Sequence, residues 1–355
     1  MKILSTCLFL SLNLIVQIKA ETKVILDLGE LPELGESMVW TPLFQATWDK
    51  WNGQHKGKPI KVEPENKLIT ALDTFKWDEK KVMPVGGYAT FAGPATKAFA
   101  EVTAIQIKKQ FGIEMAPSQI PESPDGIAAY GVLVKELNFE KAFYRSKSSF
   151  LKFRDRTNKL HSVQFFGTKG HHSAYHRRSV DVLRYEDMGI EFILSMASKT
   201  KGERVIIYKS MKAGSFRHGI NQVLASQEKP LSGKYGSLED PQLHERDTVK
   251  IPYLSLQSKA DFLTQLQGSR YFQGDSTPWR MTAAYQLTQF ELTEKGAKVR
   301  VETGAGGDPF GGPPEKPTIV PRHFICDGAF YVFLWKDDAK LPYFAALIDS
   351  ADVLK

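Results

Sequence analysis

The residues best suited to chemistry in this sequence are a histidine cluster, Cys326 and a glycine-rich stretch over residues 304–307. His171, His172 and His176 fall within six residues. Three imidazoles could hold a metal ion, but such a site needs a defined geometry and usually a carboxylate or further ligand. A solvated turn beside Arg177 and Arg178 is the alternative interpretation. We predict no metal site and no cofactor.

Cysteine chemistry is sparse. Cys326 is the only cysteine outside the first twenty residues, so a paired-cysteine zinc site and an internal disulfide are excluded for residues 21–355. Its neighbours Phe324, Ile325 and Asp327 are typical of a strand, which favours a buried structural cysteine over a nucleophile. The sequence also lacks Gly-x-Ser-x-Gly, His-Glu-x-x-His and a phosphate-binding glycine loop. We therefore predict that the protein is not an enzyme.

The first twenty residues have the pattern of a secretory signal. Lys2 is followed by a mostly apolar stretch over residues 7–18, and Ala20 supplies a small residue before a cleavage site. The stretch is too short for a stable membrane helix. We expect residues 1–20 to be removed and the protein to be secreted, to the extracellular space or, in a bacterium, to the periplasm.

The remaining chain has the composition of a globular protein. The sequence is 42% hydrophobic, and its formal charge of +7 falls to +5 when Lys2 and Lys19 are removed with the signal. This charge is too small to predict nucleic acid as the partner. No later segment is long and apolar enough to predict a membrane span. We expect a monomer whose stability comes from its hydrophobic core.

Helices are expected early in the chain and strands late. Thr41 and Pro42 predict a helix start, and a second helix over 94–110 has Phe99, Val102 and Ile105 at a spacing of three. A third helix is expected over 259–267. Apolar or alternating runs predict strands over 130–134, 162–166, 180–185, 191–196, 205–208, 249–254, 284–292, 330–335 and 343–348. This order favours an α+β fold with mostly antiparallel sheets.

Five segments, in the right chain order, resemble motifs of the serpin family. Residues 289–297, Gln-Phe-Glu-Leu-Thr-Glu-Lys-Gly-Ala, resemble the strand and hinge that precede the reactive-centre loop. Residues 324–330 resemble the motif F-x-A-D-x-P-F, with cysteine and alanine in place of its alanine and proline. Weaker similarities cover residues 343–348, residues 133–139 together with Phe143, and residues 37–42.

The resemblance implies one serpin-like domain over residues 21–355, with an exposed loop at about 297–322. In inhibitory serpins a protease cleaves this loop and forms an acyl-enzyme, and the freed loop enters the main sheet as a new strand. The hinge would comprise Glu294, Lys295, Gly296, Ala297, Val299, Val301 and Thr303. The short, proline-rich stretch between residues 112 and 130 departs from the family, and we expect the helix that normally covers the main sheet there to be missing.

The residues after Gly296 alternate in a way that suits insertion. Ala297, Val299, Val301 and Thr303 would lie on one face, and charged side chains at 298, 300 and 302 on the other. Without a covering helix those charges would meet water. Against insertion, the bulk of these residues exceeds that of a typical serpin hinge. The sequence leaves a second function open, namely a non-inhibitory secreted binding or storage protein.

The scissile bond is expected between Phe310 and Gly311 from the family's usual spacing after Glu294. An exposed phenylalanine would suit a chymotrypsin-like serine protease, although the same residue could simply anchor the loop. Arg322 lies too close to the following strand to be the cleavage site.

A basic run with interleaved phenylalanines follows residue 144. Its cationic residues are Arg145, Lys147, Lys152, Arg154, Arg156 and Lys159. A charged hairpin edge is one interpretation. The other is a patch that binds a polyanionic polysaccharide, as some serpins do.

Overall fold

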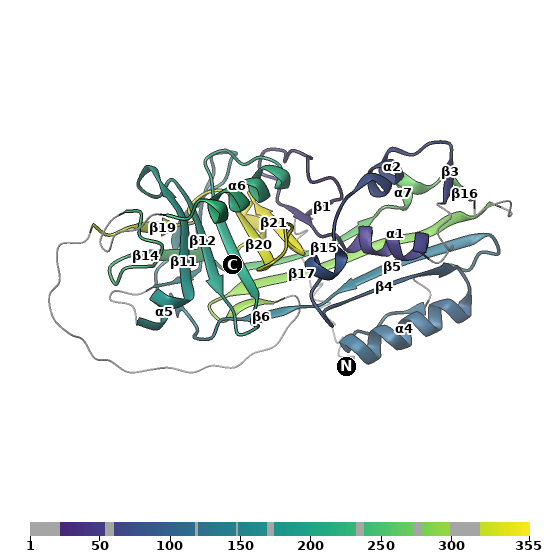
Figure 1. The fold of residues 1–355 in the computed structure, drawn as a ribbon, viewed down its shortest axis with the longest axis horizontal. Helices are drawn as coiled ribbons and strands as arrows, with labels where there is room; N and C mark the ends of the chain where they lie inside the picture. Colours follow the sequence, from purple (N-terminus) through teal and green to yellow (C-terminus); the bar gives the residue numbers. More distant parts are fainter. Residues whose placement is uncertain are drawn as a thin grey trace, which may run out of the picture.

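The computed structural model describes residues 22–53, 60–117, 120–146, 148–168, 174–231, 238–272, 278–298 and 320–355. Within these ranges the chain forms three larger sheets, two short two-stranded ribbons and helices packed around them (Figure 1). The α+β class and the mostly antiparallel pairing are confirmed. No helix among the described residues is both long and apolar enough to cross a membrane.

The sheet that carries the hinge is called the main sheet. Its strands run in the order β4 (Tyr88–Pro94), β5 (Gly126–Leu133), β17 (Arg280–Thr293), β18 (Gly296–Lys298) and β6 (Glu136–Asn138), and β15 (Leu254–Asp261) also pairs with β17. All pairs are antiparallel except β5 with β17, which is parallel.

A seven-stranded sheet contains the C-terminal hairpin. Its order is β1 (Lys23–Ile25), β2 (Met38–Trp40), β21 (Phe344–Ile348), β20 (Phe330–Lys336), β13 (Glu203–Lys209), β12 (Glu191–Ala197) and β11 (Val180–Glu186). Strands β20 and β21 are buried along almost their whole length, which explains their nearly continuous apolar sequence.

The remaining strands form smaller sheets. A four-stranded sheet has the order β19 (His323–Ile325), β14 (Thr248–Pro252), β10 (Phe165–Gly167) and β7 (Tyr144–Arg145). The ribbons pair β16 (Arg270–Phe272) with β3 (Lys61–Glu63), and β8 (Leu151–Arg154) with β9 (Leu160–Val163).

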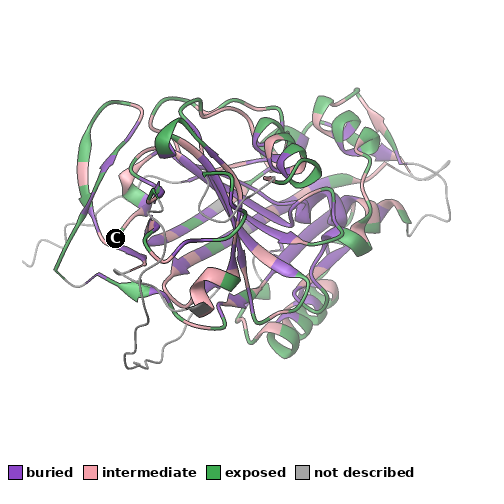
Figure 2. Cartoon of the chain, turned by 60° about the vertical axis from the view of Figure 1, so that its left-hand side comes forward, coloured by how far each residue is buried: buried purple, intermediate pink, exposed green. Residues whose placement is uncertain are grey.

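The α-helices are α1 (Leu43–Gly53), α2 (Lys67–Thr74), α3 (Glu79–Val82), α4 (Lys97–Phe111), α5 (Ala174–Ser179), α6 (Phe216–Glu228) and α7 (Leu263–Leu266). Short 3₁₀ helices cover Asp187–Gly189 and Ala351–Val353. Helices α1 and α4 lie on opposite sides of the main sheet (Figure 1), and the strands between them are mostly buried (Figure 2).

Helix α4 forms where the sequence predicts a helix, between the N-cap Thr96 and the left-handed C-cap Gly112. The prediction of which face of this helix is buried is wrong. Val102 and Ile105 are 52% and 65% exposed, whereas the buried residues are Ala100, Thr103 and Ile107. The buried face thus combines one apolar side chain, Ile107, with two small ones. The spacing of three in the sequence does not distinguish these two faces.

Other boundaries also differ from the sequence expectation. The helix expected over 259–267 begins as strand, because residues 254–261 form a full ladder with β17, and only Leu263–Leu266 is helical. The strand expected over 162–166 is divided between β9 and β10, which belong to different sheets. Helix α6 was not expected, although Ser215 caps its first turn.

Candidate functional site

The hinge residues lie at the end of β17, where the chain turns back on itself. Strand β17 ends at Thr293, Glu294 and Lys295 form the turn, and β18 starts at Gly296. Strand β18 pairs antiparallel with β17 on one side and with β6 on the other. The first three residues after the turn therefore already form a short strand inside the main sheet.

The turn is held by hydrogen bonds from two other segments. The backbone carbonyls of Glu294 and Lys295 accept bonds from the amides of Phe143 (2.8 Å) and Phe139 (2.7 Å). The Tyr253 hydroxyl donates to a Glu294 carboxylate oxygen over 2.7 Å. Burial, followed by this carboxylate, raises the pKa of Tyr253 far above its usual value, so the hydroxyl keeps its proton. These bonds fix the position at which β18 begins.

Gly296 is required by the close approach of β6. Its φ of +141° is unfavourable for residues with a side chain, and a β-carbon here would lie 2.0 Å from the backbone oxygen of Leu137. Ala297, the next residue, is completely buried. Lys298 points to the other face, where its Nζ lies 3.4 Å from a carboxylate oxygen of Glu136. These two residues follow the alternation expected from the sequence.

Beyond the end of β18, strands β5 and β17 of the main sheet are direct neighbours. Strands β5 and β17 pair directly through six residue pairs, from Gly126 with Arg280 to Gly131 with Gln286. Above Gln286 the two strands diverge, and β18 occupies the space between Glu291 and Glu136. Strands β5 and β17 thus form a wedge, and the short strand β18 lies at its open end.

The two faces of β17 near this wedge differ in chemistry. Thr288, Phe290 and Leu292 point inward and are buried, whereas Gln289 is exposed. Among the described residues between α4 and β5, which are 112–117 and 120–125, no α-helix is present. On the outer face of the main sheet the Gln289 side chain is therefore accessible to solvent.

The far end of the loop is anchored by Arg322, whose side chain is completely buried. Its Nε and Nη2 donate to Asp247 Oδ2 over 3.1 and 2.8 Å, and its backbone amide donates to Asp247 Oδ1 over 2.8 Å. Its other donors reach the carbonyls of Asp240 (2.6 Å), Leu238 (3.3 Å) and Gln242. A guanidinium so fully bonded holds the start of β19 in place.

The basic residues of the run after 144 are distributed over β7, β8 and the turn that follows β8. Arg156 bonds the buried carboxylate of Asp349 through its Nε at 2.7 Å, and Arg154 bonds the side chain of Asn158 at 2.9 Å. Lys152 donates to the Ser162 hydroxyl over 2.6 Å. Arg145 lies on β7, in a different sheet from these residues. Lys159 lies in the turn between β8 and β9, and Lys147 lies outside the described residues.

His176 and Cys326, which were considered for metal or thiol chemistry, pack against other side chains of the fold. The His176 ring stacks on Phe143 at 4.7 Å, and burial lowers its pKa. Among the described residues no group of three or more potential ligands could hold a metal ion. Cys326 is fully buried and its pKa is raised by that burial, so its thiol is protonated and unreactive.

Several predicted site residues lie outside the described ranges. They are Val299, Val301 and Thr303 of the hinge, the scissile pair Phe310 and Gly311, Lys147, and His171 and His172. The signal segment 1–20 also lies outside. These predictions remain untested.

Comparison with solved structures decides the fold. The native state of Tengpin, a thermophilic serpin, superposes with a TM-score of 0.51 at 9% identity, over 94% of this chain and 98% of that one. The chain has a serpin-like fold. The serpin-12 of Manduca sexta also matches, with a TM-score of 0.42 and 12% identity over 86% of this chain and 82% of that one. No protein-family model and no curated protein matches.

Sequence reasoning named the hinge residues but missed what holds them. Tyr253 and the backbone amides of Phe139 and Phe143 contact the turn, yet no local pattern links them to residue 294. The similarity of residues 133–139 and Phe143 to serpin motifs was the available signal. Arg322 had been weighed only as a cleavage site, whereas the structure places it as the buried anchor of β19.

Proposed function

We propose that this protein is a suicide-substrate inhibitor of a chymotrypsin-like serine protease, and that cleavage after Phe310 releases the loop for insertion into the main sheet. The observation that carries the proposal is the position of β18, which forms the first three residues of a strand between β17 and β6. The protease serine would attack the carbonyl of Phe310, and Gly311 would leave with a new amino terminus. The acyl-enzyme would then be attached to an inserting strand.

Strand pairing supplies a driving force for this insertion. Extension of β18 would break the parallel ladder of six pairs between β5 and β17. It would create two antiparallel ladders in its place, one on each side of the new strand. Antiparallel pairs are slightly more stable per residue, and their number would increase. The uncleaved loop, tethered at Arg322, cannot deliver its length to the sheet.

The register of β18 specifies where each inserted residue would lie. Lys298 pairs with Glu291 and with Glu136. Continuation of that register places Val301 opposite the inward-facing Thr288 and places residue 300 opposite the exposed Gln289. Val301 would become buried and Arg300 would remain in water, so the charges in the hinge are compatible with insertion.

Cleavage of the loop followed by a thermal melt tests the proposal. We expect a large rise in melting temperature after cleavage, and an SDS-resistant complex with chymotrypsin that is lost in Phe310→Ala. Val301→Glu should abolish the rise because it would bury a charge, whereas Arg300→Glu, on the outer face, should retain it. Degradation without a complex, together with an unchanged melting temperature, would refute insertion and trapping.

A non-inhibitory binding or storage protein is the second candidate. The hydrogen bonds that fix Glu294 and Lys295 favour it, because a tightly held turn opposes rapid insertion. The same melt separates the two functions. A cleaved protein that gains stability yet forms no complex would insert too slowly to trap a protease.

We also propose that the protein is exported after removal of residues 1–20, as the signal-like pattern suggests. Sequencing of the mature amino terminus tests this, and a start at Glu21 is expected. An intact Met1 on exported protein would refute removal of the signal.

A further inference from the structure

The outer face of α4 carries apolar side chains that no described part of the chain covers. Val102 and Ile105 are 52% and 65% exposed, and the small Ala98 is exposed one turn before Val102. These residues are four and three positions apart, so they share one face of the helix. The buried side chains of α4 lie on the opposite face, against the main sheet. The helix is therefore apolar on two sides, and only one of them is packed.

Helix α4 lies where a second molecule can reach it. Figure 1 places α4 at the lower edge of the molecule, with no other described helix or strand on its outer side. Figure 2 shows the same helix from another direction, at the bottom of the view, and its outer side is mostly exposed. Strand β19 lies at the opposite end of the molecule in Figure 1. A partner bound to α4 would therefore leave the end that carries β19 uncovered.

The charges beside this face complement a second copy of the same helix. Glu101 and Lys108 are seven residues apart, so they lie on the same side of the apolar face, about two turns from each other. Ile105 lies between them along the helix. In an antiparallel pair with its two-fold axis near Ile105, Glu101 of each copy lies beside the partner's Lys108. Two reciprocal ion pairs then flank the apolar contact.

Both charges make only exposed ion pairs within their own chain. The Lys108 Nζ lies 2.7 Å from Glu114 Oε1, and these two side chains are 65% and 79% exposed. A Glu101 carboxylate oxygen lies 3.9 Å from Lys97 Nζ. Exposed pairs of this kind contribute little to stability. Glu101 and Lys108 can therefore turn toward a second copy at small cost.

We propose that two copies of this protein associate through α4, as an antiparallel pair with Ile105 at the two-fold axis. A two-fold pair uses the same surface on both copies, so a self-complementary face favours a second copy over an unrelated partner. One helix pair buries less than the roughly 800 Å² per partner of a standard interface, so association is weak, with a dissociation constant on the order of 10–100 µM. This dimer differs from the monomer expected from the sequence, and it does not depend on whether the loop traps a protease.

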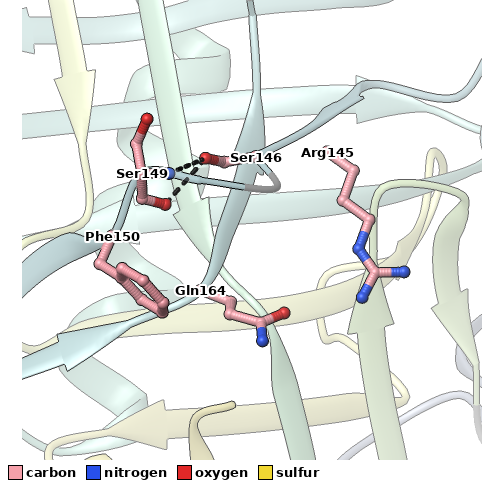
Figure 3. Close-up of a pocket in the computed structure, with 5 residues that line it drawn as sticks. All are labelled: Arg145, Ser146, Ser149, Phe150 and Gln164. Carbon is pink, nitrogen blue, oxygen red and sulfur yellow. Dashed lines mark hydrogen bonds between the residues drawn. The ribbon is translucent and has the colours of Figure 1, made fainter.

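Sedimentation velocity of the exported protein, from about 1 µM to about 500 µM, tests the association. Ile105→Gln should weaken it by about tenfold or more, because it removes the apolar side chain at the axis and keeps a good helix former. Phe150→Gln is the matched control. Phe150 is 58% exposed, but the other residues that line its pocket are polar, namely Arg145, Ser146, Ser149 and Gln164 (Figure 3). This control should change the dissociation constant by less than about twofold.

Charge reversal tests the direction of the pair. Glu101→Lys and Lys108→Glu should each weaken association by about tenfold at low salt, because each places like charges side by side. The double variant should return the dissociation constant to within about threefold of the original, since both ion pairs form again with their signs exchanged. In a parallel pair Glu101 would face the partner's Glu101, and the double variant would restore nothing.

Cysteine substitution on α4 gives a second readout. Cys326 is buried, so a thiol introduced on the outer face of α4 is the accessible one among the described residues. Under mild oxidation Ile105→Cys should give a disulfide-linked dimer, whereas Ala98→Cys, about 10 Å from the axis in each copy, should not. A monomer at every concentration, equal losses in Ile105→Gln and Phe150→Gln, no restoration in the double charge variant, or a crosslink at residue 98 would overturn the proposed pair.

Discussion

The two ends of the segment over residues 299–319 are held by different kinds of interaction. At the near end, Gly296 and Ala297 are fixed mainly by backbone pairing with β17 and β6. At the far end, the buried guanidinium of Arg322 bonds Asp247 and the carbonyls of residues 238–242. Backbone pairing can be extended one residue at a time, whereas a buried ion pair is either made or broken. The pairing at the near end can therefore lengthen in steps, whereas displacement of the far end requires the ion pair to break.

The largest effect is expected at the far end. Arg322→Met leaves Asp247 as a buried carboxylate without its cation, and should lower the free energy of unfolding by about 3–5 kcal/mol. Urea denaturation measures this. Arg280→Met is the control. The Arg280 side chain is 71% exposed, and its Nε lies 3.4 Å from Asp125 Oδ2. This substitution should lower the free energy of unfolding by less than about 1 kcal/mol. Equal losses in both variants would remove the distinction between the two ends.

A smaller effect is expected at the near end. Gly296→Ala places a β-carbon against the Leu137 carbonyl, so it should displace β18 at a cost of about 1–3 kcal/mol. Hydrogen exchange should become faster at residues 296–298 while the distal anchor at Arg322 keeps its protection. Gly53→Ala, where no atom lies within 4 Å of the added carbon, should leave exchange in β18 unchanged. Faster exchange at both ends would show that they move together.

How much of this could be predicted from the sequence depends on the range of the interactions. The apolar runs of β20 and β21 and the helical stretch of α4 are local, and the sequence predicts both. The long strand that becomes β17 is local as well and was predicted, whereas the role of Glu294 to Ala297 as a hinge stays a prediction from the family resemblance. The buried face of α4 was predicted wrongly, because Val102 and Ile105 have a helical spacing just as the buried residues Ala100, Thr103 and Ile107 do.

The partners of the hinge were hidden for the same reason. Tyr253 is 41 residues from Glu294 in the chain, and Asp247 is 75 residues from Arg322. Neither pairing has a periodic signal, because it depends on which strands become neighbours. A lone arginine before a strand gives no indication that it will be completely buried.

A third prediction concerns the side-chain bond at the near end. Tyr253→Phe removes the donor to Glu294 and should lower the free energy of unfolding by about 1 kcal/mol, with faster exchange confined to the turn at 294–295. Tyr130→Phe in the main sheet is the control, since the Tyr130 hydroxyl makes no hydrogen bond to a described residue. An unchanged exchange rate in Tyr253→Phe would leave backbone pairing as the sole restraint on the hinge.

The smallest effect is expected in the pH dependence of the free energy of unfolding, through Asp240 at the far end. Burial raises the pKa of Asp240, but bonds from the Gln242 amide and His244 outweigh it, and the net pKa lies below the usual 3.8. The folded state therefore favours the carboxylate, and its stabilisation is present above pH 3.8 and lost as the pH falls further. In Asp240→Asn the free energy of unfolding should decrease less steeply below pH 3.8 than it does in the unchanged protein, as measured by urea denaturation at a series of pH values. An identical slope in both proteins would exclude Asp240 from the acid response of the far end.

The order of the seven-stranded sheet has a consequence for biosynthesis. Strands β1 and β2 are made first, yet they join β13, β12 and β11 only through β21 and β20. The ribosome must therefore release residues 330–348 before the two halves of this sheet can meet. Until then the edges of β2 and β13 stay unpaired in the nascent chain, and a chaperone that shields them would act during this interval.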